Sequence, residues 1–279
     1  DGIRVTQVRE RERLESGGAI RNAVGVAGVK GRFVVVNGDI FIEFDLGEAL
    51  AEHERRGADL TLALCQVEDP SQFGVAALDG DGLVTGFVEK PPRGSEPGNM
   101  VNAGVWVFEA GLVDEIPPGA VRVEETLFPS LVGRRRVVLG YCFDGVWADI
   151  GTPERYLELN LRLLDAGRGT AGTEAVTNSC LAAGCQVEDG ATVRRSVLGA
   201  GCVVGRDATI EGSVLWEKVA VHEGAFVGDS VLADGVVVGA GARAEGVVAG
   251  RGAVILPGVE VPRGTSLEPG ERYHGEDGS

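Results

Sequence analysis

The chain has 279 residues, 44% apolar and 24% charged, so it can bury one large core or two smaller ones. Its 26 basic and 42 acidic residues give a net charge of −16, which argues against nucleic acid or an anionic membrane as partner, because both require a basic face. No apolar run approaches the length of a membrane span, and the first residues lack signal-peptide character. The five cysteines have no metal-finger spacing, so we expect reduced thiols in a cytoplasmic protein.

The first informative stretch is residues 33–39, four apolar residues followed by Asn-Gly-Asp. Before it, residues 1–8 alternate like a strand, and a Ser-Gly-Gly turn at 16–18 can cap a short helix or present N–H groups to a ligand. The apolar run predicts a strand buried on both faces, as in the middle of a parallel sheet. Ligands bind at the C-terminal ends of such strands, so Asp39 is a candidate metal ligand. The alternative is a plain turn with Asp39 capping or solvated.

A helix and a second strand follow and suggest a βαβ unit. Leu46, Ala49, Leu50 and His53 share one face of a helix that ends at Gly57, and we expect His53 to be packed. Residues 60–67 read as the next buried strand. Strand, helix and strand with short connections predict a parallel α/β sheet.

Residues 73–78 and 83–88 flank an Asp-Gly turn, which predicts a hairpin ending in Glu89 and Lys90. This pair could contact sugar hydroxyls and a phosphate, or form an exposed ion pair of little worth. Another strand is expected at 101–108, where Gly104 would let a ligand approach closely. A short helix is expected at 124–132, interrupted by a proline. A strand pair at 141–150 ends in Asp149, and Thr152 then caps a helix that runs to about residue 164.

Five short motifs occur in order across residues 16–160. They are Asn37-Gly38-Asp39, Phe73-Gly74-Val75, Glu89-Lys90-Pro91, Asn102-Ala103-Gly104 and Trp147-Ala148-Asp149-Ile150-Gly151-Thr152-Pro153. Together they resemble the sugar-1-phosphate nucleotidyltransferases, and the chain is most similar to the mannose-1-phosphate guanylyltransferase branch. The resemblance implies a Rossmann-like, mostly parallel α/β sheet domain over residues 1–166. The family's opening Gly-rich loop, with its Arg and Lys, has no match here, so we expect an N-terminally incomplete catalytic domain.

The resemblance also implies roles for individual residues. Asp39 and Asp149 would together hold Mg²⁺, Glu89 would bind sugar hydroxyls, and Lys90 would bind the sugar phosphate. Asp39, Lys90 and Asp149 are therefore the implied catalytic residues. The remaining implied substrate-binding residues are Gly18 against the nucleotide, Gly38, and, around the sugar, Gly74, Asn102 and Gly104.

The implied reaction transfers a nucleotidyl group from an NTP to a sugar 1-phosphate and releases pyrophosphate, with GTP and mannose 1-phosphate as the expected pair. Such a reaction needs positioning and charge neutralisation more than a covalent nucleophile. A metal held by two carboxylates, together with a lysine, can supply both. Two alternatives stay open: a glucose-1-phosphate thymidylyl- or uridylyltransferase, and a non-catalytic regulatory or sensor subunit that binds an NDP-sugar.

From Val187 onward the chain repeats every 17 residues. Small apolar residues recur at intervals of 6, 6 and 5, with glycines at one corner, which predicts a parallel β-solenoid over residues 170–267. It is similar to the left-handed β-helix of hexapeptide repeats. We expect Cys185 and Cys202, one period apart, to stack in its core, and we expect a homo-oligomer assembled through this domain. The apolar rows are Val187, Val204, Val221, Val238 and Ile255; Val193, Ile210, Val227, Ala244 and Val261; and Leu198, Leu215, Leu232 and Ala249.

Overall fold

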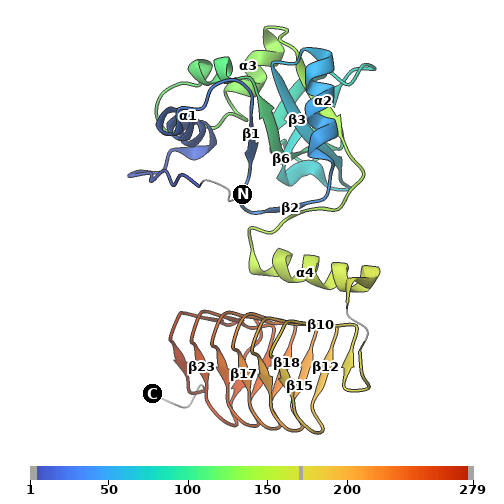
Figure 1. Cartoon of the computed structure of the whole chain (residues 1–279), viewed down its shortest axis with the longest axis vertical. Helices are drawn as coiled ribbons and strands as arrows, with labels where there is room; N and C mark the ends of the chain where they lie inside the picture. Colours follow the sequence, from blue (N-terminus) through green and yellow to red (C-terminus); the bar gives the residue numbers. More distant parts are fainter. Residues whose placement is uncertain (1–4, 170–171, 276–279) are drawn as a thin grey trace. The chain divides into compact units, whose positions relative to one another are not determined.

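The computed structural model describes residues 5–169 and 172–275. Its contacts divide the chain into two units, residues 1–148 and residues 149–279 (Figure 1). The helices among the described residues are too short or too polar to cross a membrane. The sequence predicts the boundary between the two domains at residues 166–170, whereas the contacts divide the chain after residue 148. The predicted domain boundary stays a prediction.

The first unit is built on a six-stranded mixed sheet. β3 and β7 are parallel, and the other pairings are antiparallel. The predicted α/β class is confirmed, but the sheet is mixed rather than mostly parallel, because β6 lies between β1 and β3 and runs opposite to both. The spatial order is β5 (Val84–Glu89), β4 (Gly74–Leu78), β6 (Met100–Phe108), β3 (Leu60–Gln66) and β7 (Val138–Cys142), with β1 (Phe33–Val36) also on β6.

β1 is half-exposed, and the prediction that it is buried on both faces is wrong. Its partner among the described strands is β6, with Val36 opposite Val105, and Val36 is 57% exposed. An apolar run is fully buried only where strands and helices cover it on every side. The strand expected at the start of the chain is not formed over residues 5–8, and residues 1–4 lie outside the described residues.

Side chains from the sheet fill two apolar clusters, one on each face. In β3, Leu62 and Leu64 point to one cluster while Ala63 and Cys65 point to the other, as the alternation of a strand requires. The first cluster also holds Phe128 of α3, whose ring meets those of Trp106 and Phe108. The helices of this unit are α1 (Glu15–Ala27), α2 (Leu46–Arg56) and α3 (Leu127–Gly133), with short 3-10 turns η1 (Pro70–Gln72) and η2 (Ala110–Glu115).

The boundaries of α2 follow from its caps. The Asp45 side chain accepts a hydrogen bond from the Glu48 N–H at 3.0 Å, and Gly57 ends the helix with a φ of 57°. His53 is fully buried, with its Nδ1 2.7 Å from Thr61 Oγ1, so its predicted packing role is confirmed. α3 begins three residues later than expected, and Pro129 then falls in its first turn, where a missing N–H costs nothing.

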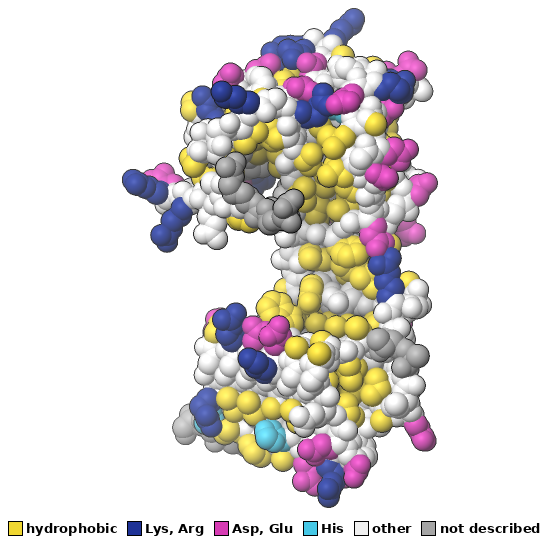
Figure 2. Space-filling model, viewed as in Figure 1, with side chains coloured by type: hydrophobic (Ala, Val, Ile, Leu, Met, Phe, Trp, Pro, Cys, Tyr) yellow, Lys and Arg dark blue, Asp and Glu magenta, His cyan; other side chains and the backbone are white. Residues whose placement is uncertain are grey.

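Charged side chains of both signs are interspersed on the face seen in Figure 2. On the face that Figure 2 shows, Lys and Arg lie among Asp and Glu, and the described residues there form no continuous basic patch. Oppositely charged side chains also pair in the first unit: Arg136 contacts Asp59 at 2.6 Å, and this contact lowers the pKa of Asp59. The face in view therefore lacks the basic stripe typical of nucleic-acid binding.

The second unit begins with a helix and continues as a solenoid. α4 (Pro153–Leu163) is capped by Thr152, whose hydroxyl accepts from the Arg155 N–H at 3.4 Å, and a π-helical turn (Leu164–Arg168) follows. The Tyr156 ring of α4 lies 6.4 Å from that of Trp216 in the solenoid. The predicted start of this helix is confirmed.

The solenoid consists of three six-stranded parallel sheets, and its successive coils lie side by side in Figure 1. Val193 pairs with Ile210, Val187 with Val204, and Leu198 with Leu215, so the three predicted rows and the 17-residue period are confirmed. Its strands are Val176–Thr177, Cys180–Leu181, Gln186–Val187, Thr192–Arg194, Val197–Leu198, Val203–Val204, Thr209–Glu211, Val214–Leu215, Ala220–Val221, Phe226–Gly228, Val231–Leu232, Val237–Val238, Arg243–Glu245, Val248–Ala249, Val254–Ile255, Glu260–Val261, Ser266–Leu267 and Arg272–Tyr273, numbered β9 to β26.

A ladder of buried serines runs inside the solenoid. The backbone N–H of Ser196, of Ser213 and of Ser230 each donates to the hydroxyl oxygen of the serine one coil earlier at 3.1 Å, beginning at Ser179. Each hydroxyl in turn donates to the carbonyl two residues before it. The ladder ends where the Val247 N–H donates to Ser230 Oγ at 3.0 Å. Polar groups in the interior are thereby paired from coil to coil.

Two further features of the solenoid concern its cysteines and the backbone at one of its corners. Cys202 is a free thiol buried in the core, as predicted, and Cys185 is a partly buried free thiol packed against it. Burial raises the pKa of Cys202 to about 11. At the corner where Gly190 has a φ of 75°, the next coil carries Asp207 with a φ of 56°. Aspartate is among the few side chains that tolerate this left-handed conformation.

Candidate active site

The site is built around a gap in the pairing of β6. β3 runs along one edge of β6 from Met100 to Phe108. The other edge is shared by β4, which pairs at residues 100–101, and β1, which pairs at residues 105–108. Residues 102–104, the β6 gap, are therefore left without a strand on that edge. A backbone stretch between two strand ends is a place where a ligand can approach closely.

Gly104 and Asn37 close one side of the β6 gap. The Asn37 N–H donates to the Gly104 carbonyl at 2.8 Å, and Gly104 has a φ of 77°. A Cβ on Gly104 would lie only 2.9 Å from Asn37 Nδ2. Glycine is thus required here both by the backbone conformation and by the close approach of the Asn37 side chain.

Asn102 is held in place by Trp106. Its Oδ1 accepts a hydrogen bond from Trp106 Nε1 at 2.7 Å and another from the Gly104 N–H at 3.1 Å. Trp106 itself is buried. Both donors engage the same oxygen, and Nδ2 of Asn102 donates to no group among the described residues, so it could serve a ligand.

Glu89 and Gly74 lie opposite each other on the next strand pair. β4 and β5 bring them into register, and a Cβ on Gly74 would come within 2.7 Å of Glu89 Oε2, so this glycine makes room for the carboxylate. The Glu89 side chain is 17% exposed. Burial raises the pKa of Glu89, the charge of Glu124 raises it further, and Lys90 and Arg122 oppose both. Such a carboxylate is a strong acceptor for ligand hydroxyls.

Lys90 leaves the strand beside Glu89 and reaches outward. Its N–H donates to the Phe73 carbonyl at 3.0 Å, while its Nζ lies 4.0 Å from Glu89 Oε1. The Lys90 side chain is 60% exposed, so its ion pair with Glu89 is weak and the ammonium is available to a phosphate.

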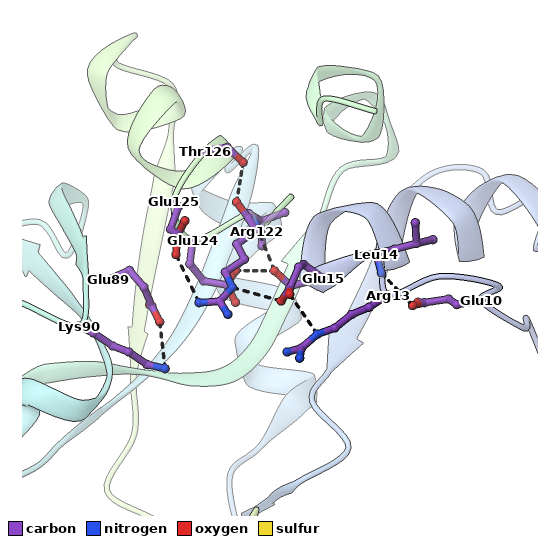
Figure 3. Close-up of polar contacts among 12 residues, drawn as sticks. Glu10, Arg13, Leu14, Glu15, Glu89, Lys90, Arg122, Glu124, Glu125 and Thr126 are labelled. Atoms are coloured by element: carbon purple, nitrogen blue, oxygen red, sulfur yellow. Dashed lines mark hydrogen bonds and ion pairs between the residues drawn. The ribbon is translucent and has the colours of Figure 1, made fainter. Parts of the chain in front are cut away.

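Residues 121–124 meet the start of α1 beside Glu89 and Lys90 (Figure 3). The sequence patterns did not predict this contact. The Ser16 hydroxyl donates to Glu124 Oε2 at 2.5 Å and accepts from the Val123 N–H at 3.1 Å. The Gly17 N–H donates to the Val121 carbonyl at 2.8 Å. Residues 16–18 lie inside α1, which begins at Glu15 with Leu14 at its N-cap position, so the prediction of a Ser-Gly-Gly turn that caps the helix is wrong. The Ser16 hydroxyl instead docks α1 onto this segment. The only signal in the sequence is the two adjacent glycines at 17–18, which permit close backbone contact.

Gly18 and Gly38, the other two glycines predicted to contact the substrate, have different surroundings. Gly18 packs so tightly that a Cβ would lie 2.3 Å from the Gly119 carbonyl, yet it also lines a cavity of 370 Å³ with Leu14 and Arg21. Gly38 is exposed, and a Cβ there would meet nothing within 4 Å. Space alone therefore requires glycine at position 18 but not at position 38.

The two predicted metal ligands belong to different units. Asp39 is exposed in the turn between β1 and β2 (Ile40–Ile42), and its side chain makes no hydrogen bond or ion pair within the described residues. Asp149 ends β8 (Trp147–Asp149), a strand that pairs with β2. Its carboxylate accepts from Arg155 Nη1 at 2.8 Å and from the Gly151 N–H at 2.9 Å. The described residues hold no cluster of three or more potential ligands, and the Asp39–Asp149 pair stays a prediction.

Comparison with known families assigns both parts of the chain. The model of the family described as nucleotidyl transferase matches residues 2–166. The chain belongs to the nucleotidyl transferase family. A second model, described as the EIF2B subunit epsilon LbH domain, matches residues 169–267, the solenoid. The family resemblance inferred from the five motifs and the repeat is thereby confirmed.

Several curated nucleotidyl transferase relatives are mannose-1-phosphate guanylyltransferases. A putative mannose-1-phosphate guanyltransferase of Sulfolobus acidocaldarius is 34% identical over 160 residues, 57% of this chain and 43% of the relative. The mannose-1-phosphate guanylyltransferase of Mycobacterium tuberculosis is 35% identical over 177 residues, 63% and 48% respectively. A catalytic subunit beta of this enzyme from Dictyostelium discoideum is 31% identical over 159 residues, 56% and 43%. The chain spans about half the length of these relatives.

Proposed function

We propose that the chain transfers a nucleotidyl group from an NTP to a sugar 1-phosphate, using Mg²⁺, with GTP and mannose 1-phosphate as substrates. The observation that carries this proposal is the convergence of four motifs at the β6 gap. Asn37, Gly74, Glu89 and Asn102 come from separate segments, and strand pairing draws them to one place. The names of the relatives support the choice of base and sugar.

The proposed reaction needs no covalent intermediate. An oxygen of the sugar phosphate attacks the α-phosphorus of the NTP, the bond from that phosphorus to the leaving oxygen breaks, and pyrophosphate departs. Glu89 accepts hydrogen bonds from sugar hydroxyls, Asn102 Nδ2 donates one, and Lys90 binds the sugar phosphate. These contacts hold the attacking oxygen in position, which is where much of the rate gain in such a reaction arises.

Asp39 and Asp149 are the proposed ligands of Mg²⁺. Carboxylate oxygens are the donors that this ion prefers, so the chemistry of the pair fits. When bound, the metal would offset the negative charge of the phosphates. Asp39 is exposed, whereas the Asp149 carboxylate accepts a hydrogen bond from Arg155, which would compete with a metal for it. Arg155→Gln should therefore lower the Mg²⁺ concentration that gives half-maximal turnover, and an unchanged concentration would argue against Asp149 as a ligand.

An assay for pyrophosphate release tests the activity. The purified full-length protein is incubated with Mg²⁺, each of GTP, UTP, dTTP and ATP, and either mannose 1-phosphate or glucose 1-phosphate. We expect the fastest release with GTP and mannose 1-phosphate. Asp39→Asn and Asp149→Asn should abolish turnover while the circular dichroism spectrum stays unchanged. Absence of release from every pair would refute the proposal, and a preference for dTTP or UTP with glucose 1-phosphate would reassign the substrates.

A non-catalytic subunit that binds an NDP-sugar is the second candidate. It is favoured by the ion pair between Asp149 and Arg155, which occupies a carboxylate that catalysis would need. Binding of GDP-mannose, measured by calorimetry, together with absence of turnover would support this alternative. We also propose catalytic and solenoid domains at residues 1–166 and 170–267, and a homo-oligomer assembled through the solenoid, which light scattering on chains with and without the solenoid would test.

A further inference from the structure

The three sheets of the solenoid differ in the character of their outer faces. Along each strand one side chain points into the core and the next points outward. In the sheet that begins with β9, the outward residues are mostly polar or charged, and the aromatic ring among them is stacked with the Arg243 guanidinium at 4.0 Å. This face suits contact with water. Its outward residues are Thr192, Arg194, Thr209, Glu211, Phe226, Arg243, Glu245 and Glu260.

In the sheet that begins with β10, the outer row is apolar and α4 lies against it. Leu157 of α4 lines a cavity of 620 Å³ together with Val231 and Val248 of this row. Val214, in the same row, is only 2% exposed, although its neighbour Leu215 is the residue that points into the core. An apolar outer row on this solenoid therefore accompanies an element that covers it.

The sheet that begins with β11 has a second apolar outer row, which we call the β11 row. Its members are half-buried, and they are Val203, Ala220, Val237 and Val254. The helices among the described residues of the second unit are α4, at the β10 sheet, and the π-helical turn. Asp165 of that turn pairs with Arg195 at 2.6 Å, at the corner between β12 and β13. Neither helix lies on the β11 row, so a group from outside this unit is needed to cover it.

The two ends of the β11 row carry opposite charges. Gln186 ends the row in the first coil, and Glu188 lies on the same face two residues later. Arg272 ends the row in the last coil, with His274 two residues later. All four residues are exposed, and the Arg272 side chain makes no hydrogen bond or ion pair within the described residues. Glu271, which precedes Arg272, accepts a hydrogen bond from a backbone N–H instead.

We propose that the β11 row is the interface of a homodimer in which two solenoids pack face to face and run in opposite directions. A two-fold axis parallel to the strands places the first coil of one copy against the last coil of the other. Val203 then faces Val254 of the partner subunit, and Glu188 comes close to Arg272 of the partner subunit. Two solenoids that run in the same direction would instead bring Arg272 against its own copy. This inference rests on the proposed homo-oligomer and not on the proposed reaction.

The size of the face sets the expected strength of the dimer. Six strands about 4.8 Å apart, with about six residues on each side of a coil, give a face of roughly 24 Å by 20 Å. Two such faces bury roughly 1,000 Å² in total, which is at the lower end for a specific complex. We therefore expect a dimer that dissociates on dilution through the micromolar range.

Sedimentation velocity of the full-length protein over a series of micromolar concentrations measures the dissociation constant. Val237→Glu should give a monomer at every concentration, because it places a charge at the apolar centre of the face. The matched control is Thr209→Glu, which puts the same charge on the outer face of the β9 sheet and should leave the dimer intact.

Exchanging the end charges tests their pairing. Arg272→Glu and Glu188→Arg should each weaken the dimer about 10-fold, since a dimer contains two such contacts. The protein with both substitutions should return to within about threefold of the wild type. Failure of the double variant to recover would overturn the opposite orientation of the two solenoids.

Cysteine cross-linking tests the same orientation without a charge change. On oxidation with diamide, a Val203→Cys and Val254→Cys double variant should form a covalent dimer beyond the wild-type background. The two positions lie three coils apart in one chain, about 14 Å, too far for a disulfide within the chain. Val203→Cys alone should not cross-link, and a covalent dimer of it would overturn the inference.

Two further results would overturn it: a wild-type protein that is monomeric at every concentration, or a Val237→Glu variant that dimerises as the wild type does. The second result would keep the proposed homo-oligomer but assign it to another surface. If Val237→Glu fails to fold, as judged by circular dichroism, the cross-linking of the cysteine variants decides the matter. Pyrophosphate release is measured separately, so loss of the proposed reaction leaves this inference standing.

Discussion

Gly104→Ala should destabilise the first unit and disturb the proposed sugar pocket. A side chain at the Gly104 φ of 77° costs about 1–2 kcal/mol. Its Cβ would also lie 2.9 Å from Nδ2 and 3.1 Å from Cγ of Asn37, so that side chain must leave its rotamer at a further cost of about 1 kcal/mol. Together these effects lower the free energy of unfolding by about 2–3 kcal/mol. Urea unfolding followed by tryptophan fluorescence measures this loss, and the KM for the sugar 1-phosphate should rise with it.

Gly38→Ala is the matched control, one residue from Asn37. Gly38 is not among the glycines with positive φ, and a Cβ there would meet nothing within 4 Å. The substitution should leave stability unchanged or raise it by about 0.4–1 kcal/mol, because alanine restricts the unfolded chain. Equal stability of the two variants would refute the steric reasoning. Reduced sugar binding in a stable Gly38→Ala variant would support the predicted contact between Gly38 and the substrate.

Two further substitutions probe charge and burial. Because burial and the charge of Glu124 place the folded-state pKa of Glu89 above its unfolded value of 4.5, ionisation of Glu89 costs stability as pH rises through that interval. Glu89→Gln should therefore have a higher Tm than the wild type near pH 8 and the same Tm near pH 3, and a lower Tm near pH 8 would contradict the pKa argument. Ser213→Ala leaves the buried Ser230 N–H without an acceptor, so it should lower the free energy of unfolding of the solenoid by about 1–3 kcal/mol, measured in urea. The control is Ser95→Ala at an exposed position, which should change stability by less than about 0.5 kcal/mol. Equal losses in the two variants would contradict a stabilising role for the serine ladder.

The solenoid and α2 were predictable because each rests on a local rule. A period of 17 places Val193 over Ile210 in every coil, so one coil determines the register of the rest. In α2, the acid before the first turn and the glycine after the last turn mark both ends. Rules that act over a few residues, or that repeat, can be found from a single sequence.

The order of strands in the first unit was not predictable from the same kind of pattern. The sequence places β1, α2 and β3 in succession, which suggests neighbouring strands. In the structure β6, more than thirty residues beyond the end of β3, lies between them and runs opposite to both. No periodicity encodes which distant strand inserts, and the exposure of β1 follows from that insertion.

The candidate site shows the same limit. Gly74, Glu89, Asn102 and Gly104 could be singled out because short motifs mark them, and they surround the β6 gap as pairing dictates. The contact between Ser16 and Glu124 joins positions 108 residues apart that belong to no periodic pattern. The segment at residues 121–124 was missed for this reason. Its neighbours are set by folding alone.

The serine ladder makes one coil of the solenoid interchangeable with the next. Each coil from Ser179 to Ser230 presents the same donor and acceptor to its neighbours, so a duplication of 17 residues there would insert a coil without requiring any new contact. A deletion whose length is not a multiple of 17 would break the ladder and the apolar rows together. After Val247 the serines stop, and Val248 pairs with Ser266, one residue beyond the period. Evolution could therefore lengthen or shorten this domain in whole coils, without altering the chemistry of the first unit.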